Sequence, residues 1–283
     1  MNYRHIYHAG NFADVVKHIT LIELLRHLAK KPEPFCYLDT HAGIGRYPLT
    51  AIQAQKTLEY RGGVGRLIDA AALPAPLADY VALVRSFDPT AQSSEQLQVY
   101  PGSPALARVL LRPQDRAVLA ELHSEDGPAL KRLFAGDPQV AVHLMDGYHA
   151  LKAFLPPKER RGLVLVDPPF EVEDEFERLV EGLKQAHRRW ATGIYALWYP
   201  VKDRREVHRF QQALKKTGIR KQLLIELCLY PDDDPRRLNG CGLVVVNPPW
   251  QFDEKMREAL TALAPLLTDP AQTRIVVDWL VPE

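Results

Sequence analysis

The sequence predicts an α/β fold in which a mostly parallel, doubly wound sheet carries one antiparallel strand and a helical insertion. Short apolar runs alternate with segments of helical periodicity along most of the chain, and this alternation is typical of a parallel sheet with helices on both faces. The alternation stops over residues 48–99, where helical and Pro/Ala-rich segments predominate. It fails again at 231–240, which joins two strands without a helix. A connection that short permits an antiparallel pair and excludes a parallel crossover.

The length and composition fit one large domain. The chain has 283 residues, of which 46% are hydrophobic and 25% charged, as in ordinary globular proteins. We therefore expect a single domain over 1–283, with 48–99 as an insertion within it. The amino-terminal stretch is interrupted by Asp14, Lys17 and Glu23, so it predicts neither a signal peptide nor a membrane span. The three cysteines are widely scattered, which is typical of reduced thiols in a cytoplasmic protein.

The first elements of the fold are a helix, a strand and a glycine turn. Apolar residues recur at helical spacing over 12–30, and "FCYLD" (35–39) is predicted as a buried strand. "THAGIGRY" follows this strand as the turn. After the insertion, Ser103 and Pro104 are the residue types of a helix N-cap and a first helical position.

The remaining elements follow in regular order. Short apolar runs predict strands at 117–122, 140–146, 163–167, 193–199, 222–230, 243–247 and 274–281. Helical periodicity predicts helices at 126–135, 173–190, 204–217 and 251–266. It also predicts a helix that ends at about residue 154. Because the strand at 243–247 follows the short connection, we expect it to run opposite to its neighbours.

Two of these strands end in nearly the same phrase, "LVLVDPPF" (163–170) and "LVVVNPPW" (243–250). In open parallel sheets, ligands bind beyond the carboxyl ends of the strands. The acids that end parallel strands are therefore expected at one edge: Asp39, Glu121, Asp146 and Asp167. Asn247 ends the reversed strand, so we expect it at the opposite edge. The sequence thus predicts a site at the first phrase and a structural strand exit at the second.

The first phrase suits the capture of an exocyclic amine on a nucleic-acid base. Such an amine is a poor nucleophile because its lone pair is delocalised into the ring. The Asp167 carboxylate and the Pro168 carbonyl can accept its two hydrogens and free the lone pair, and the proline restricts Asp167 to extended conformations. Phe170 can stack on the base. The alternative interpretation is a strand stop made of prolines.

The turn after the first strand favours a cofactor that contains a nucleoside. Gly43 and Gly45 let the backbone approach a ligand closely. Glu121 is placed for ribose hydroxyls, and Asp146 with Gly147 for an adenine ring. A dinucleotide fingerprint needs a third glycine and an acid about 20 residues further on. Here Ile44-Gly45-Arg46-Tyr47 breaks the glycine pattern, and the next acid at a strand end is Glu121, past the insertion. The pattern therefore favours S-adenosylmethionine over NAD.

Positive charge gathers in one stretch of a chain whose net charge is only +1. Residues 184–221 contain many Lys and Arg but only two acids, Asp203 and Glu206. Lys202, Arg204 and Arg205 leave a strand at the same edge as Asp167, so they are expected to meet RNA phosphates. The alternative is a pair of solvated helix faces.

Several motifs together resemble the RlmJ family, bacterial methyltransferases of adenine N6 in 23S ribosomal RNA. They occur in order along nearly the whole chain: "YRHIYHAGNFADVVKH", "YLDTHAGIGRY", "YPGSP", "LVLVDPPF" and "ATGIYALWYP". The resemblance implies a Rossmann-like methyltransferase fold with a helical insertion, S-adenosylmethionine as methyl donor, and a monomer. The residues that it implies in cofactor binding, alongside Gly43 and Gly45, are His18, His41, Ser103, Glu121, Asp146, Gly147 and Asp167. It also implies Asp167 as the catalytic acceptor and Tyr3 as an RNA contact. Many relatives have tyrosine where this chain has Phe170, so stacking is kept but a phenolic hydrogen bond is not.

Other interpretations of these residues stay open. His18 on an apolar helix can be a packed histidine, and Ser103 can be explained by helix capping. His5 and His8 have HxxH spacing, but no Cys or Asp pair completes a metal site. A methyltransferase of small molecules or of protein side chains would not need the basic stretch, and a non-catalytic RNA-binding module would not need a cofactor site. We also expect Tyr3 and the histidine-rich residues 1–10 to close over the site without being needed for folding.

Overall fold

The computed structural model describes residues 3–232 and 234–283. In this part of the chain, eight strands form one sheet in the order β10-β8-β9-β7-β6-β1-β4-β5. The strands are β1 (Cys36–Asp39), β4 (Arg116–Ala120), β5 (Val140–His143), β6 (Gly162–Val166), β7 (Ile194–Val201), β8 (Gln222–Cys228), β9 (Gly240–Val246) and β10 (Arg274–Val281). The expected α/β fold class is confirmed.

The sheet is parallel from β5 to β7 and antiparallel beyond β7. β9 lies between β7 and β8 and runs opposite to both, which confirms the predicted reversed strand. The cause is the connection between β8 and β9, which holds no helix. β10 also runs antiparallel to its neighbour β8, so the sheet has a second reversed strand whose direction the sequence pattern left open.

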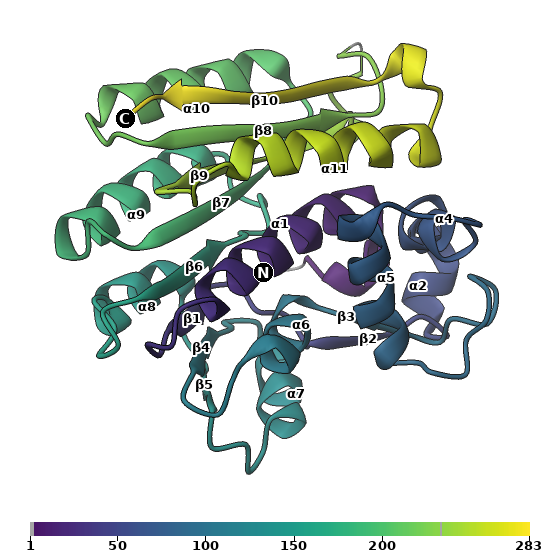
Figure 1. The fold of residues 1–283 in the computed structure, drawn as a ribbon, viewed down its shortest axis with the longest axis horizontal. Coiled ribbons are helices and arrows are strands. Elements are labelled where there is room, and N and C mark those ends of the chain that lie inside the picture. Colours follow the sequence, from purple (N-terminus) through teal and green to yellow (C-terminus); the bar gives the residue numbers. More distant parts are fainter. Residues whose placement is uncertain (1–2, 233) are drawn as a thin grey trace.

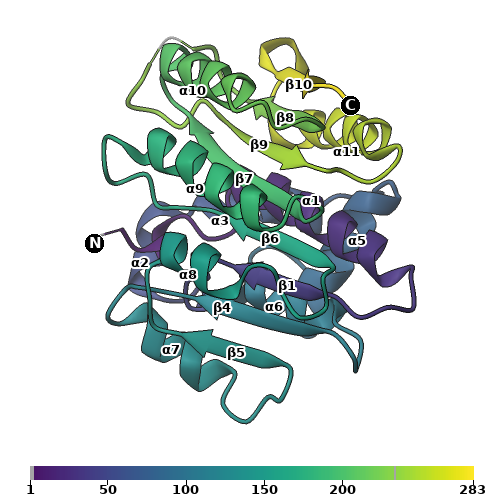
Figure 2. The same ribbon diagram turned by 90° about the vertical axis from the view of Figure 1, so that its left-hand side faces the viewer.

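Helices cover both faces of the sheet (Figures 1 and 2). On one face lie α8 (Gly147–Phe154), α9 (Glu175–Arg189) and α10 (Arg204–Lys216), which pack on a core cluster of their own. On the other face lie α1 (Phe12–Ala29), α6 (Ser103–Leu110), α7 (Asp126–Leu133) and α11 (Phe252–Leu267). No helix in the described residues is long and apolar enough to cross a membrane.

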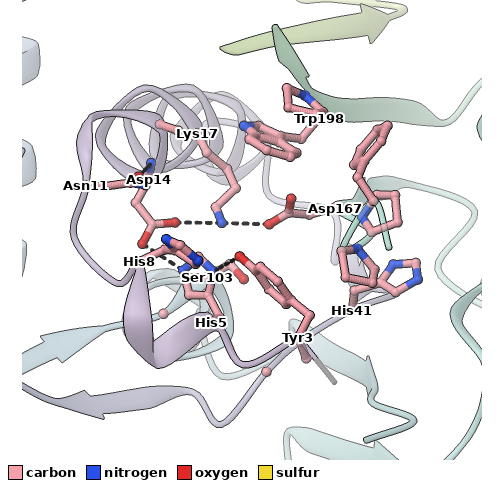
Figure 3. A pocket seen from close by; sticks show the side chains of 18 of the residues that line it. Tyr3, His5, His8, Asn11, Asp14, Lys17, His41, Ser103, Asp167 and Trp198 are labelled. Atoms are coloured by element: carbon pink, nitrogen blue, oxygen red, sulfur yellow. Dashed lines mark hydrogen bonds and ion pairs between the residues drawn. The ribbon is translucent and has the colours of Figure 1, made fainter. Parts of the chain in front are cut away.

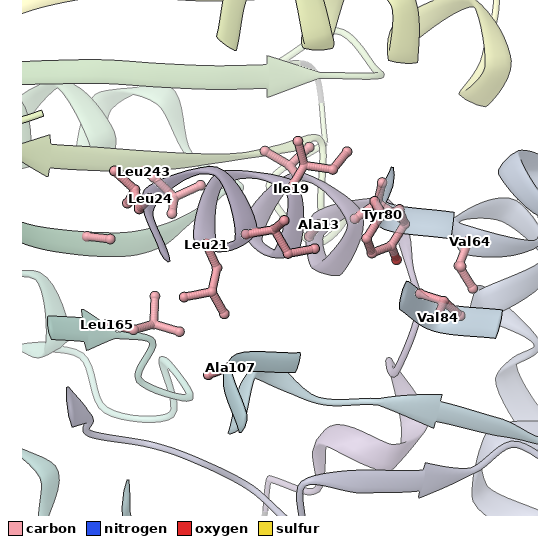
Figure 4. Packing of buried hydrophobic residues seen from close by; sticks show 14 of the residues in the cluster. Ala13, Ile19, Leu21, Leu24, Val64, Tyr80, Val84, Ala107, Leu165 and Leu243 are labelled. Carbon is pink, nitrogen blue, oxygen red and sulfur yellow. The ribbon is translucent and has the colours of Figure 1, made fainter. Parts of the chain in front are cut away.

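Helix α1 is buried on nearly all sides, although its sequence pattern predicted a one-sided stripe. Figure 4 shows its apolar residues packed towards Leu165 and Leu243 of the sheet and towards Tyr80 and Val84. The polar residues of α1 are buried too, including Asp14, Lys17 and His18. Buried charged groups are stable only with partners, and Lys17 has two, Asp14 on the same helix and Asp167 after β6.

The chain between β1 and β4 carries the extra helices. These are α2 (Ile52–Thr57), α3 (Glu59–Gly62), α4 (Val64–Ile68) and α5 (Ala75–Ser86), flanked by β2 (Arg46–Pro48) and β3 (Val99–Pro101). β2 and β3 pair with each other, with Tyr47 opposite Tyr100. They bring both ends of this segment together beside α1 (Figure 1).

Candidate active site

A cavity of about 340 Å³ opens where β1, β4 and β6 end, between the sheet, α1 and the amino-terminal segment (Figure 3). Ten of the predicted site residues line it: Tyr3, His18, His41, Gly43, Ser103, Glu121, Asp167, Pro168, Phe170 and Lys202. The other five, which do not line it, are Gly45, Asp146, Gly147, Arg204 and Arg205. The cavity therefore lies at the edge of the sheet that was predicted from the strand ends.

Asp167 follows β6 and is held by a buried ammonium. Its Oδ2 accepts a hydrogen bond from Lys17 Nζ at 2.6 Å, and the same Nζ lies 2.8 Å from Asp14 Oδ1. Burial alone would lower the pKa of Lys17, but the two carboxylates outweigh it and hold the pKa well above its ordinary value. Lys17 is therefore charged, and it fixes the Asp167 carboxylate at the carboxyl end of β6 (Figure 3).

Phe170 is held in an aromatic group beside Asp167. Its ring packs edge-on against Phe176 and Trp198, with centroids 5.0 and 5.9 Å apart. Its φ of 51° lies in the left-handed region, which a bulky residue rarely adopts. Phe170 and Pro168 both line the cavity.

Glu121 and the glycine turn form one hydrogen-bonded unit. Glu121 Oε2 accepts from the Gly43 amide and Oε1 from the His123 amide, both at 2.7 Å. Burial raises the pKa of Glu121, while the two amides oppose the rise. Gly43 and Gly45 have φ values of 61° and 78°, which side chains disfavour. Gly43 faces the cavity, whereas Gly45 packs against Leu130 and Leu133 of α7.

His18 is buried and only half satisfied. Its Nδ1 lies 2.8 Å from Tyr100 Oη, while its Nε2 has no hydrogen-bond partner within the described residues. Burial lowers the pKa of His18 to about 3, so the ring is neutral. It is thus both a packed histidine and a cavity residue with a free ring nitrogen. Burial likewise lowers the pKa of His41 to about 4.

The predicted N-cap role of Ser103 is wrong. Gly102 occupies the N-cap of α6, and Ser103 is the first helical residue. Its hydroxyl instead donates to Asp39 Oδ2 at 2.7 Å, as does the Tyr37 hydroxyl. Burial raises the pKa of Asp39 to about 6 despite these two donors. Ser103 therefore orients a buried acid at the end of β1.

Asp146 and Gly147 lie beside the cavity. Asp146 caps α8, accepting from the His149 amide at 2.9 Å, and pairs with Arg178 at 3.4 Å. Gly147 lies against Thr40 and His41. Gly147 thus borders His41, which lines the cavity, and Asp146 precedes it in the chain.

The predicted RNA residues differ in their surroundings. The Arg204 guanidinium lies 2.8 Å from the buried Glu226 and 3.0 Å from Asp232, so it holds the sheet edge together. These two pairs compete with any phosphate for Arg204, and its contact with RNA stays a prediction. Lys202 lines the cavity, and the Arg205 side chain is 89% exposed beside Asp203.

The amino-terminal segment is built into the fold. Residues 1 and 2 lie outside the described residues, but Ile6 and Ala9 belong to the core. Arg4 lies 2.6 Å from Glu125 of the connection before α7. The expectation that residues 1–10 can be deleted without loss of the fold is therefore wrong, because the deletion removes core residues.

Tyr3 ends a hydrogen-bonded row that enters the site. Its hydroxyl lies 2.9 Å from His5 Nδ1, and its ring stacks on His8 at 5.6 Å. His8 Nδ1 in turn lies 2.9 Å from Glu59, a residue of α3. The two histidines of the HxxH spacing thus have separate partners, and within residues 3–232 and 234–283 no group of His, Cys, Asp or Glu could hold a metal ion.

Sequence reasoning missed Asp14, Lys17 and Trp198 as site residues. The available signal was an acid and a lysine three residues apart on an otherwise apolar helix. Such a pair is expected to be buried together, but its distant partner Asp167 is not visible in the sequence.

Asn247 lies at the opposite edge of the sheet, as predicted. Its side-chain amide donates to the carbonyls of Ala191 and Gly193, both at 2.8 Å, just before β7 begins. Trp250 at the end of the second phrase is 89% exposed. The second phrase is therefore a hydrogen-bonded strand exit remote from the cavity.

Comparisons with known proteins find relatives over the whole chain. The family described as "Ribosomal RNA large subunit methyltransferase D, RlmJ" matches residues 32–281. Proteins named "Ribosomal RNA large subunit methyltransferase J" from Haemophilus influenzae and Escherichia coli are each 45% identical over 283 residues, which is 100% of both chains. The crystal structure of protein LPL1258 from Legionella pneumophila is 35% identical, covers 96% of this chain and 98% of its own, and gives a TM-score of 0.87.

Proposed function

Because the chain belongs to the RlmJ family of large-subunit ribosomal RNA methyltransferases, we propose that it transfers the methyl group of S-adenosylmethionine to N6 of an adenine in 23S ribosomal RNA. The observation that carries the proposal is Asp167, which lies at the carboxyl end of β6 before two prolines and is fixed by Lys17. This is the group that an exocyclic amine requires.

The residues around the cavity fit S-adenosylmethionine. The free Nε2 of His18 is a buried polar atom without a partner in the described part of the chain, and a polar group of a ligand would satisfy it. Glu121 is placed to accept from ribose hydroxyls, next to the Gly43 amide that it holds. We propose His41, Ser103, Asp146 and Gly147 as further cofactor residues because they border the same end of the cavity. When bound, the cofactor supplies an activated methyl group.

The chain's own residues then prepare the amine. The Asp167 carboxylate accepts one N–H of the adenine amine and the Pro168 carbonyl accepts the other, so that the lone pair turns towards the methyl group. Phe170, which lines the cavity, stacks on the base, and Lys17 orients the Asp167 carboxylate through an ion pair at 2.6 Å. A proton must leave N6, and Asp167 is the acceptor in contact with it.

RNA contacts are proposed for Tyr3, Lys202 and Arg205. Lys202 lines the cavity, and Arg205 is exposed on the next turn of chain. Both cations follow β7 at the same edge of the sheet as Asp167, so they would lie close enough to bind phosphates that flank a flipped adenine.

The experiment incubates the purified protein with radiolabelled S-adenosylmethionine and ribosomal RNA from cells that lack this methyltransferase, and maps the methyl group. We expect one methyl group on N6 of one adenine in 23S ribosomal RNA. Label in free nucleosides or in protein, but not in RNA, would favour a methyltransferase of another amine. Binding of RNA without any binding of S-adenosylmethionine in calorimetry would identify a non-catalytic RNA-binding protein.

A further inference from the structure

We infer that Asp14 is a positioning residue that connects Asp167 to the amino-terminal segment and provides the path by which the amine proton leaves the closed site. The inference rests on the proposed function. It concerns the departure of the amine proton from Asp167, whose side chain is only 15% exposed.

A continuous row of hydrogen-bonding groups runs from Asp167 to the amino-terminal segment (Figure 3). Asp167 Oδ2 lies 2.6 Å from Lys17 Nζ, which lies 2.8 Å from Asp14 Oδ1. The other oxygen of Asp14 lies 2.8 Å from His5 Nε2, and His5 Nδ1 lies 2.9 Å from the Tyr3 hydroxyl. Every link is within hydrogen-bond distance, so a proton can move along the row without movement of a heavy atom.

Burial of the groups rises along the row towards Asp14 and falls again at its outer end. The Lys17 and Asp14 side chains are 6% and 1% exposed, whereas the His5 side chain is 21% exposed. The proton therefore starts beside the amine, crosses two groups that are shielded from water, and emerges at a ring that solvent reaches.

The transfer balances as follows. The N6 lone pair forms the new N–C bond as the S–C bond breaks and its electron pair stays on sulfur. N6 is then positively charged, and its N–H bond breaks as the proton passes to Asp167. Lys17 receives this proton while it gives one of its own to Asp14, so it remains an ammonium. Asp14 passes a proton to His5 Nε2 as the His5 ring releases a proton to water, and no other reactant is needed.

Asp14 is suited to hold the proton only transiently. Burial raises its pKa, but His5 and Lys17 outweigh burial and hold the pKa well below its ordinary value. Titratable groups from four parts of the fold face Asp14 and His5. They are Tyr3 of the amino-terminal segment, Lys17 and His18 of α1, three residues of the segment from β2 to β3 (Tyr47, Glu59 and Tyr100), and Asp167 after β6. His5 itself lies 2.8 Å from Asp14 and its side chain is 21% exposed, so it is the group in contact with Asp14 that reaches solvent.

A purely structural role is the competing explanation. Asp14 Oδ2 also accepts from the Gly10 amide at 2.8 Å, and the Asp14 amide donates to the N-cap residue Asn11. The test must therefore separate loss of charge from loss of shape. Asp14→Asn does so, because asparagine keeps the size of the side chain and an oxygen for Gly10 but carries no charge.

The first measurement is the single-turnover rate of RNA methylation by the wild type. We expect Asp14→Asn to lower this rate by about 100-fold. Its affinities for S-adenosylmethionine and RNA should be unchanged at matched melting temperature. The wild-type rate should depend on pH because a proton leaves along this row, and Asp14→Asn should lose that dependence. Asp14→Glu, which restores a carboxylate, should recover part of the rate and of the pH dependence.

A second variant keeps the test decisive if Asp14→Asn folds poorly. His5→Gln keeps a hydrogen-bonding side chain but cannot take up the proton, and the double variant should be no slower than the slower single variant, since both act on one path. Rate losses that multiply would overturn the inference, and so would a well-folded Asp14→Asn with the wild-type rate and pH profile. An inactive wild type would overturn the proposed function and this inference with it.

Discussion

A single ammonium group, Lys17 Nζ, joins the two carboxylates of the site. It lies 2.8 Å from Asp14 and 2.6 Å from Asp167. A buried pair of like charges is strongly unfavourable, and a cation between them removes the penalty. Lys17 therefore holds Asp14 and Asp167 together at the cavity.

Asp39 gives the fold a pH dependence of its own. Its folded-state pKa of about 6 lies above the ordinary value, so the folded protein binds a proton that the unfolded chain releases first. Stability should fall as pH rises from about 4 to about 6, by about 3 kcal/mol. Urea unfolding at about pH 4.5 and about pH 7.5 should show a larger loss for the wild type than for Asp39→Asn. Equal losses would mean that Asp39 does not carry this titration.

Glu121→Ala should weaken S-adenosylmethionine binding. The variant loses charged acceptors for the ribose and releases the Gly43 amide, which should cost about 1.5–3 kcal/mol. Calorimetry without RNA measures the change, and Glu254→Ala, an exposed glutamate of α11, is the control. An affinity unchanged by Glu121→Ala would remove this residue from the cofactor site.

At the scale of elements, the helices inserted after β2 brace the amino-terminal segment. The Val64 amide donates to the Gly10 carbonyl at 2.8 Å, and Glu59 accepts from His8 and Asn11. The sequence led us to expect that this insertion serves RNA, which stays a prediction. Its visible contact is with the segment that carries Tyr3 and His5 into the site.

Gly63→Ala should loosen this bracing. A Cβ at Gly63 would come within 2.1 Å of the Gly10 carbonyl oxygen, so the backbones must move apart, at a cost of about 1–3 kcal/mol. We expect a lower melting temperature and slower single-turnover methylation. Gly62→Ala is the matched control, since nothing lies within 4 Å of its Cβ. If both variants behave alike, the contact between the insertion and the segment does not support the site.

At the scale of the whole molecule, the cations at the edge of the sheet should set the salt dependence of RNA binding. Lys202→Ala and Arg205→Ala together should lower RNA affinity and flatten the plot of log affinity against log salt by about one unit for each lost contact. S-adenosylmethionine binding should not change. Binding of RNA that is insensitive to salt in the wild type would show that these cations form only a solvated surface.

The arrangement of the sheet could be predicted because it follows from local patterns. Alternating strands and helices placed Asp167 and Glu121 at one edge, and the short connection before β9 placed Asn247 at the other. Pairings between distant residues could not be predicted in this way. Lys17 lies 150 positions from Asp167, and no local pattern joins them.

Distant partners contact two side chains for which the local sequence predicted other roles, and for Ser103 the predicted role is wrong. Ser103 has the residue type of an N-cap, but its hydroxyl donates a hydrogen bond to the buried Asp39. Arg204 begins an exposed-looking basic stretch, but the buried Glu226 requires a cation. In both cases a buried carboxylate outweighs the preference that the local sequence expresses.

The most direct measurement compares Asp167→Ala with Asn247→Ala, since each removes the polar residue of one phrase and leaves both prolines. Asp167→Ala should lower the single-turnover rate of RNA methylation by about 10²–10⁴-fold while the protein stays folded, because Lys17 keeps its pair with Asp14. Asn247→Ala should keep the wild-type rate per folded molecule and lose about 1–2 kcal/mol of stability with its two hydrogen bonds. A well-folded, inactive Asn247→Ala beside an active Asp167→Ala would contradict the account.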